Sequence, residues 1–442
     1  MTIEARVTGQ RLALACGATA TLVSASLLGA LLGYTQKLAC SSGGAWNNFV
    51  GQFRADCYTD IYPLYYGEGL SSGKVPYLDH PVEYPVLIGW MMEVASWLVR
   101  GVSDVYARGQ DFYYVTVVML AICLVAGVLA TAYAAGPQRR WAALMVALSP
   151  ALIFAAYVNW DMLAMGLTAC GMAAWAARRP VLAGVLISLG VSAKFYPLVV
   201  FAALFLLCLR AGQMRAFGRC FGAGVAAWLI VNVPIAIVNL SGWARFYAFS
   251  RDRGADWGSI WYLLEHYNVP LVGTTSLTSL NILSTAVFVV MAAGIAALTL
   301  GAPRRPRVAQ VAFLLLAAFL ISNKVWSPQY VIWLVPLAVL ARPRLWPYVL
   351  WQAAELVYFF GIWSYFVGMY APPGGITANW YFATLLARLV TVALVAAFVV
   401  RDILHPADDV VRRDGVDDPA GGILNGTSDR FRLNVSRPVP VA

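Results

Sequence analysis

Residues 181–210 read VLAGVLISLGVSAKFYPLVVFAALFLLCLR, two apolar runs separated by the polar break Lys194-Phe195-Tyr196-Pro197. Each run is shorter than the roughly 20 apolar residues of an ordinary membrane-spanning helix. Paired short helices interrupted at a proline are typical of membrane proteins that enclose a cavity at bilayer depth. One long helix kinked at Pro197 is the alternative. The pattern favours two helices.

Apolar runs recur along almost the whole chain of 442 residues. Hydrophobic residues make up 61% of the positions and the mean hydropathy is +0.70, more than a soluble core requires. The sequence lacks the ten-residue alternation of a membrane barrel. The predicted fold class is therefore all-α, a polytopic membrane protein with about twelve transmembrane helices. After a first helix over 12–32, the expected spans are about 112–135, 141–158, 160–177, 181–194, 197–210, 219–239, 276–300, 308–323, 328–341, 346–366 and 379–400.

Arginines cluster in the short gaps between these runs and predict the orientation. Basic residues collect on the cytoplasmic side of membrane proteins, which places both termini there. The clusters are too scattered for a nucleic-acid surface, so we expect no nucleic-acid partner. The polar residues 403–442 predict a disordered cytoplasmic tail behind a transmembrane domain of residues 1–402. The clusters are Arg139-Arg140, Arg178-Arg179, Arg210/Arg215/Arg219, Arg304-Arg305/Arg307 and Arg342/Arg344.

This orientation leaves two long loops on the outer side, a first loop over residues 34–110 and a second loop over about 240–275. Residues 85–102 of the first loop are apolar, but a span there would carry Glu93 and reverse the arginine pattern. A re-entrant or interfacial helix is therefore predicted. The aromatic spacing of the second loop predicts an amphipathic helix on the membrane. A disulfide between Cys40 and Cys57 is a hypothesis that requires an oxidising compartment.

The first loop contains DCYTDIYPLYYGEGLSSGKVPYLDHPVEYP over residues 56–85, where carboxylates alternate with tyrosines. An interfacial aromatic belt with solvated acids is one interpretation, and a polar site at the bilayer surface is the other. Asp60 follows Asp56 by four residues, so on a helix the two acids share a face and one binds its proton more tightly. Such a carboxylate is a candidate general base.

Two lysines lie at the ends of apolar helices, Lys194 before Tyr196-Pro197 and Lys324 before Trp326-Ser327-Pro328. A lysine at such a depth needs an anion or water. Together with Arg251 and Arg253 they predict a cationic ring that clamps a phosphate. Separate snorkelling of each side chain to the interface is the alternative.

Two further acids have competing interpretations. Asp161 begins a helix, where capping of the backbone and substrate binding are both supported. Glu355 lies in the middle of a span and is either functional or paired with a buried base such as Arg388. The three histidines have no metal-binding spacing and no glycine-rich phosphate loop is present, so we expect no metal and no cofactor.

Several islands between residues 54 and 340 resemble glycosyltransferase family 87, whose members have the GT-C fold. They are CYTDIYPLYYGEGL, GKVPYLDHPVEYPVL, SPALIFAAYVNWDMLA, LGVSAKFYPLVV and KVWSPQYVIWLVPL. The resemblance implies a bacterial cytoplasmic-membrane enzyme whose active site faces outward. Its expected donor is a polyprenyl-phosphate sugar, typically mannose, and its expected acceptor is a glycolipid or cell-envelope glycan. The lipid-linked sugar is then the co-substrate, and no nucleotide-binding domain is needed.

The resemblance places the catalytic base on Asp60, with Asp56 as a nearby competitor, and implies an inverting displacement. A transporter or lipid-carrier flippase is the alternative function; it predicts inverted repeats, which the sequence does not show. A non-catalytic envelope scaffold is the third possibility. The predicted substrate-binding residues are Tyr65, Glu83, Tyr84, Asp161, Lys194, Tyr196, Arg251, Arg253, Lys324, Gln329 and Tyr330.

Overall fold

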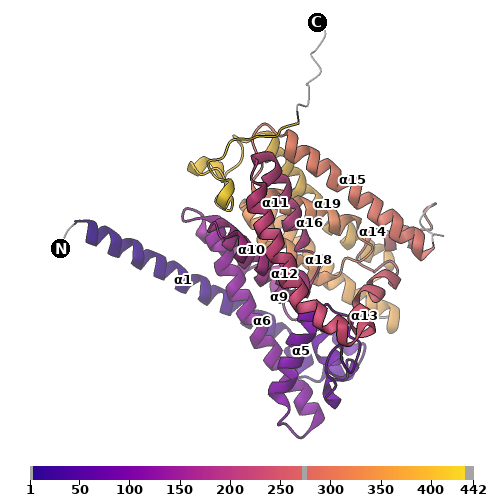
Figure 1. The fold of residues 1–442 in the computed structure, drawn as a ribbon. Coiled ribbons are helices and arrows are strands. Elements are labelled where there is room, and N and C mark those ends of the chain that lie inside the picture. Colours follow the sequence, from indigo (N-terminus) through magenta and orange to yellow (C-terminus); the bar gives the residue numbers. More distant parts are fainter. Residues whose placement is uncertain (1–2, 271–275, 434–442) are drawn as a thin grey trace.

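The computed structural model describes residues 3–270 and 276–433, which fold into helices with no β-strand among them (Figure 1). The all-helical membrane class is confirmed, because five of the described helices are long and apolar enough to cross a bilayer. The predicted number of about twelve spans is not confirmed. The five are α1 (Ile3–Gln36), α6 (Val105–Ala135), α12 (Met214–Val238), α15 (Leu277–Gly301) and α19 (Ala378–Leu404).

The other helices of the body are α9 (Asp161–Ala176), α10 (Pro180–Ala193), α11 (Leu198–Ala211), α16 (Val308–Ser322), α17 (Val331–Ala341) and α18 (Leu345–Tyr370). Helices α10 and α11 confirm the prediction of two helices around Pro197. Between them Lys194 is extended, with φ −155° and ψ 146°, so the helix ends there. This break holds Lys194 and Tyr196 at the junction of two helices.

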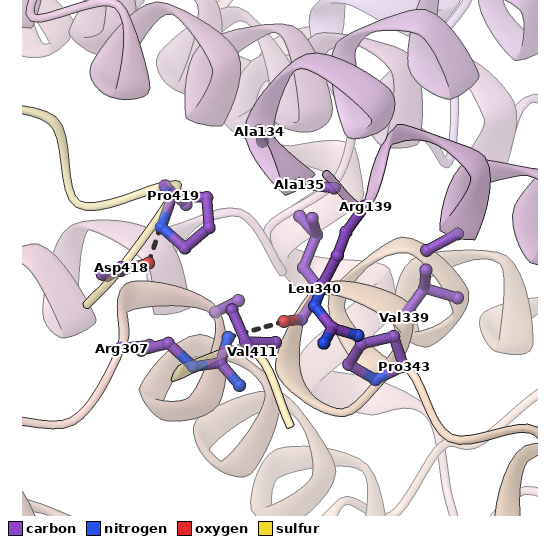
Figure 2. Close-up of a pocket in the computed structure, with 13 residues that line it drawn as sticks. Ala134, Ala135, Arg139, Arg307, Val339, Leu340, Pro343, Val411, Asp418 and Pro419 are labelled. Carbon is purple, nitrogen blue, oxygen red and sulfur yellow. Dashed lines mark hydrogen bonds between the residues drawn. The ribbon is translucent and has the colours of Figure 1, made fainter. Parts of the chain in front are cut away.

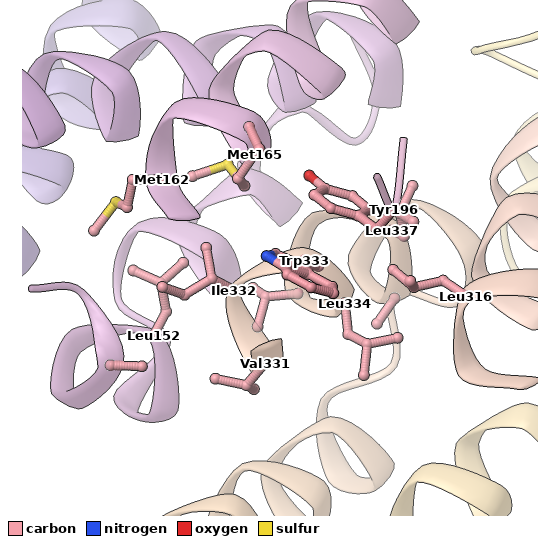
Figure 3. Packing of buried hydrophobic residues seen from close by; sticks show 14 of the residues in the cluster. Leu152, Met162, Met165, Tyr196, Leu316, Val331, Ile332, Trp333, Leu334 and Leu337 are labelled. Atoms are coloured by element: carbon pink, nitrogen blue, oxygen red, sulfur yellow. The ribbon is translucent and has the colours of Figure 1, made fainter. Parts of the chain in front are cut away.

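Helix α17 forms the centre of the core. All of its residues from Val331 to Ala341 are buried, as expected for a helix that is apolar on every side. Figure 3 shows Trp333 of this helix beside Tyr196, with Met165 of α9 and Leu316 of α16 around it. The ring centroids of Tyr196 and Trp333 are 4.7 Å apart and the rings are stacked. The core therefore continues directly into the α10–α11 junction.

The predicted span over 141–158 is wrong. The chain there forms three short pieces: the 3₁₀ turn η3 (Arg140–Ala143), α7 (Leu144–Ala147) and α8 (Pro150–Ala155). Pro150 has no N–H to continue a helix and forces Ser149 into an extended conformation, with ψ 115°. The Ser149 hydroxyl then caps α8 by accepting from the N–H of Leu152 at 3.2 Å.

The first loop is built from short helices. The predicted helix after Pro85 is confirmed as α5, whose 14 residues span about 21 Å and are too short to cross a bilayer alone. The hypothesis of a disulfide between Cys40 and Cys57 is also confirmed. The elements are α2 (Leu38–Ser41), η1 (Ala45–Asn47), α3 (Gly51–Arg54), α4 (Ile61–Gly67), η2 (Leu70–Ser72) and α5 (Val86–Val99).

The described part of the second loop contains α13 (Leu240–Asp252) and α14 (Ile260–His266), so the helix predicted from the aromatic spacing is present. Its residues 271–275 lie outside the described part of the chain.

The expectation of a disordered tail is corrected for residues 405–433, which pack against the body (Figure 2). Asp409 is buried and bonds Nε of the buried Arg307 at 2.8 Å. Asp429 lies 2.7 Å from Nη2 of Arg210. Arginines at these ends of α11 and α16 thus bind the tail. The tail itself contains two 3₁₀ turns, η5 (Arg412–Asp414) and η6 (Gly422–Leu424). Residues 434–442 lie outside the description.

Glu355 is paired with the buried base Arg388, one of the two interpretations that the sequence left open. Nε of Arg388 in α19 lies 3.0 Å from Oε2 of Glu355 in α18, and both side chains are buried. Arg388 also donates to the backbone carbonyls of Trp326 and Ser327, at 3.0 and 3.1 Å. The pair therefore anchors the connection between α16 and α17, which contributes to the site.

Candidate functional site

A cavity of about 730 Å³ opens where the two loops meet the helix ends. Parts of the chain far apart in sequence line it: the first loop, the α10–α11 junction, the second loop, the α16–α17 connection, the C-terminal half of α18, and Asn159 before α9. The tail packs at the opposite ends of α11 and α16, so it lies away from the cavity (Figure 1). The much smaller hollow of about 10 Å³ beside the tail, drawn in Figure 2, has no connection to this site.

Asp60 lines the cavity and lies immediately before α4. Its side chain does not cap that helix. Instead Oδ1 accepts from the Tyr58 hydroxyl at 2.6 Å and Oδ2 from the Tyr84 hydroxyl at 3.2 Å. Burial raises the pKa of Asp60, while the Tyr58 hydrogen bond and the charge of Lys194 pull it down. A desolvated carboxylate aimed by two hydroxyl groups is suited to accept a proton.

Glu83 is the second carboxylate in the wall of the cavity. Burial, followed by the neighbouring charge of Asp60, raises the pKa of Glu83. The two acids therefore influence each other's protonation, and one of them is the more basic.

Lys194 brings positive charge to the same region. Its ammonium lies 2.9 Å from Oδ1 of Asp161 and 4.6 Å from the ring centroid of Tyr84, the tyrosine that also bonds Asp60. Asp161 is fully buried behind this lysine and does not line the cavity. Asp60 and Lys194 are thus each held by specific partners, Asp60 by two tyrosine hydroxyls and Lys194 by Asp161.

Arg253 also lines the cavity, and its Nη2 donates to Oδ1 of Asp256 at 2.7 Å. Lys324 lines the cavity, but its ammonium donates to the backbone carbonyl of Arg251 at 2.9 Å and to that of Arg253. The N–H of Asp256 in turn donates to the Lys324 carbonyl at 2.8 Å. Lys324 therefore fastens the second loop to the α16–α17 connection, a role that the sequence did not indicate.

Nine of the predicted residues lie around this one cavity: Asp60, Glu83, Tyr84, Lys194, Tyr196, Arg253, Lys324, Gln329 and Tyr330. Asp56, Tyr65, Asp161 and Arg251 do not line it. Tyr65 is buried, 4.7 Å from Phe112 between ring centroids. Arg251 is exposed and pairs with Asp252. Asp56 has φ 52°, and burial raises its pKa to about 6.

Sequence reasoning missed two residues next to Asp60. Tyr58 lies within residues 56–85; its hydroxyl donates to Asp60, and its ring stacks on Trp363 with the centroids 4.6 Å apart. Lys37 was overlooked at the end of the first apolar run, and it is fully buried beside Tyr58. A count of lysines would have been the available signal, since the chain contains only four.

Among the described residues, no group of three or more His, Cys, Asp or Glu side chains could hold a metal ion. The expectation that the site works without a metal or cofactor stays a prediction.

The model of glycosyltransferase family 87 matches residues 108–328, half of the chain. The chain belongs to this family. No curated protein matches it.

The segment that matches glycosyltransferase family 87 contains three of the cavity residues, Lys194, Arg253 and Lys324. Asp60 and Glu83 precede the matched segment, and they reach the family region through the fold. The N–H of Asp60 donates to the carbonyl of Val158 at 2.7 Å. In this glycosyltransferase the chain at Asp60 is therefore hydrogen-bonded to the segment that matches the family model.

Proposed function

We propose that this glycosyltransferase moves a hexosyl group, mannose in the first instance, from a polyprenyl-phosphate donor to a glycolipid or cell-envelope glycan. The observation that carries the proposal is a single cavity lined by Asp60, Lys194 and Arg253. A base for the acceptor and cations for a phosphate leaving group are the two requirements of such a transfer.

In the proposed reaction the acceptor hydroxyl oxygen bonds the anomeric carbon from the face opposite the phosphate. The bond from that carbon to the phosphate oxygen breaks, and its electron pair leaves with polyprenyl phosphate. The hydroxyl proton passes to Asp60, whose raised pKa makes it a stronger base. Configuration is inverted, and the lipid-linked sugar is consumed as co-substrate.

Charge develops on the departing phosphate, where Lys194 and Arg253 would stabilise it. Phosphate needs little protonation to leave, so preorganised cations suffice. The less buried aromatic side chains of the cavity wall, such as Phe249 and Trp257, would contact the sugar rings.

Two observations support action on the outer face of the bacterial cytoplasmic membrane. The Cys40–Cys57 disulfide lies in the first loop, and disulfides persist mainly in oxidising compartments. Arginines that bond the tail gather at the opposite helix ends, which fits the positive-inside rule. Family membership and the absence of a repeat in the sequence weigh against the transporter alternative.

The test compares purified wild-type protein with Asp60→Asn and Asp56→Asn, using radiolabelled polyprenyl-phosphate mannose and a membrane lipid extract. Asp60→Asn is expected to lower transfer by about 10²–10⁴-fold, the usual contribution of a general base. Asp56→Asn should retain far more activity because Asp56 does not line the cavity. Equal transfer by wild type and Asp60→Asn would remove Asp60 from the role, and no transfer from any lipid-linked sugar would favour a transporter.

A further inference from the structure

The chain contains four lysines, Lys37, Lys74, Lys194 and Lys324. Lys74 is exposed, and the other three are buried. Lys194 and Lys324 line the cavity, whereas Lys37 has no exposed surface and does not line it. Burying an ammonium group is unfavourable unless it has specific partners. The partners of Lys37 therefore indicate what it does.

Lys37 contacts the catalytic region through one residue. Its Nζ donates to the backbone carbonyl of Tyr58 at 2.8 Å and lies 5.6 Å from the ring centroid of Phe359. The hydroxyl of the same Tyr58 donates to Oδ1 of Asp60 at 2.6 Å. The lysine thus holds the main chain of the residue whose side chain orients the base.

The surrounding segment is attached on two sides. The disulfide from Cys40, three residues after Lys37, joins Cys57 beside Tyr58. On the other side Thr59 donates its hydroxyl proton to the carbonyl of Tyr157 at 2.7 Å. Between these attachments, Lys37 holds the main chain of Tyr58, while the Tyr58 ring stacks on Phe53 and Trp363.

Taking the proposed function as its basis, we propose that Lys37 is a positioning residue for Asp60, acting through Tyr58. By holding the Tyr58 backbone, it fixes the position from which the Tyr58 hydroxyl donates to the Asp60 carboxylate. Burial lowers the pKa of Lys37 to about 7, against the opposing charges of Asp56 and Asp60. The nitrogen donates to a carbonyl in either protonation state, so the contact itself supplies the positioning.

The test measures kcat and donor KM for Lys37→Met, Lys37→Arg and the matched control Lys74→Met, with polyprenyl-phosphate mannose and a membrane lipid extract. Lys37→Met is expected to lower kcat by about 10–100-fold, the loss that follows a small misplacement of a catalytic group. Donor KM should stay within about twofold, because Lys37 does not line the cavity. Lys37→Arg keeps a donor and should recover part of kcat, while Lys74→Met matches wild type.

A double-mutant cycle with Tyr58→Phe examines the route of action. If Lys37 acts through Tyr58, the decrease in kcat of the double variant is smaller than the product of the decreases in the two single variants. Additive losses, an unchanged kcat in Lys37→Met, or a change in KM alone would overturn the proposal. Should Lys37→Met fail to fold, Lys37→Gln replaces it, because the shorter amide does not reach the carbonyl; full activity there would equally overturn it.

Amide hydrogen exchange of residues 57–62 provides a readout that needs no activity. Faster exchange there in Lys37→Met than in Lys74→Met supports the proposal, and unchanged exchange overturns it. The two hypotheses fail separately: wild type that transfers no sugar sinks the proposed function, whereas active wild type with unaffected Lys37 variants sinks the positioning role alone.

Discussion

The ammonium of Lys194 lies 2.9 Å from Oδ1 of Asp161, a carboxylate with no exposed surface. The lysine comes from the break between α10 and α11 and the acid from the first residue of α9. The cation that faces the cavity is therefore balanced by an acid behind the wall. A phosphate in the cavity would meet an ammonium group that is already oriented.

This pairing predicts the effect of Asp161→Asn. Removing one partner leaves a buried ammonium uncompensated, which destabilises the fold by about 3–5 kcal/mol. The double variant Asp161→Asn/Lys194→Met should regain much of that stability, because the uncompensated charge is gone. Thermal or denaturant unfolding in detergent measures both. If the stability that the double variant loses equals the sum of the losses in Asp161→Asn and Lys194→Met, the two side chains are not coupled.

The hydrogen bond from Tyr58 predicts a shift in the pH dependence of transfer. Asp60 acts only when ionised, so the rate rises as pH passes through its pKa, which burial holds above the usual value. Tyr58→Phe removes a bond that lowers this pKa, so the acidic limb should move to higher pH. The control is Tyr106→Phe, whose ring is exposed. A limb that stays in place, or moves to lower pH, would contradict the assignment of Asp60 as base.

The disulfide predicts a loss of stability when Cys40 and Cys57 are both replaced by Ser. The bond joins residues 17 positions apart, and closing a loop of that size stabilises a fold by about 3 kcal/mol. Unfolding temperature and transfer should fall together, because Tyr58 adjoins Cys57. The double variant of the free cysteines Cys123 and Cys170 serves as the control. Unaltered stability without the disulfide would show that other contacts hold the segment.

The ordered tail predicts a contrast between two neighbouring acids. Asp409→Asn leaves the buried Arg307 without its charged partner and should lower the free energy of unfolding by about 3–5 kcal/mol. Asp408→Asn changes only an exposed pair with Arg401 and should leave stability near that of wild type. Chemical unfolding of the two variants, side by side, provides the comparison; equal stabilities would contradict the predicted contrast.

Features that depend on local chain chemistry could be predicted from the sequence. The apolar runs identified most of the helices, and Pro197 marked the break that carries Lys194. The acids and tyrosines of residues 56–85 indicated residues that line the cavity, because a carboxylate among aromatic residues is unusual in an apolar chain. Asp60 was thereby placed in the cavity wall before its partners were known.

Features that depend on distant partners could not be predicted. The tail has a composition typical of disorder, but its partners are arginines far back in the sequence: Arg307 lies 102 positions before Asp409, and Arg210 lies 219 positions before Asp429. Lys324 and Lys37 donate to backbone carbonyls, which leave no pattern of side chains to detect. The run 141–158 is apolar throughout, and hydropathy does not register the missing N–H of Pro150.

The unequal exposure of the lysines has a practical consequence for establishing sidedness. Lys74 is the one lysine with an exposed side chain, since Lys37 is fully buried and Lys194 and Lys324 are mostly buried in the cavity wall. An acylating reagent that cannot cross the bilayer would therefore react with Lys74 in preference to the other lysines when the first loop faces outward in intact cells. Labelling of Lys74, read by peptide mass and abolished in Lys74→Met, would report directly which compartment that loop occupies.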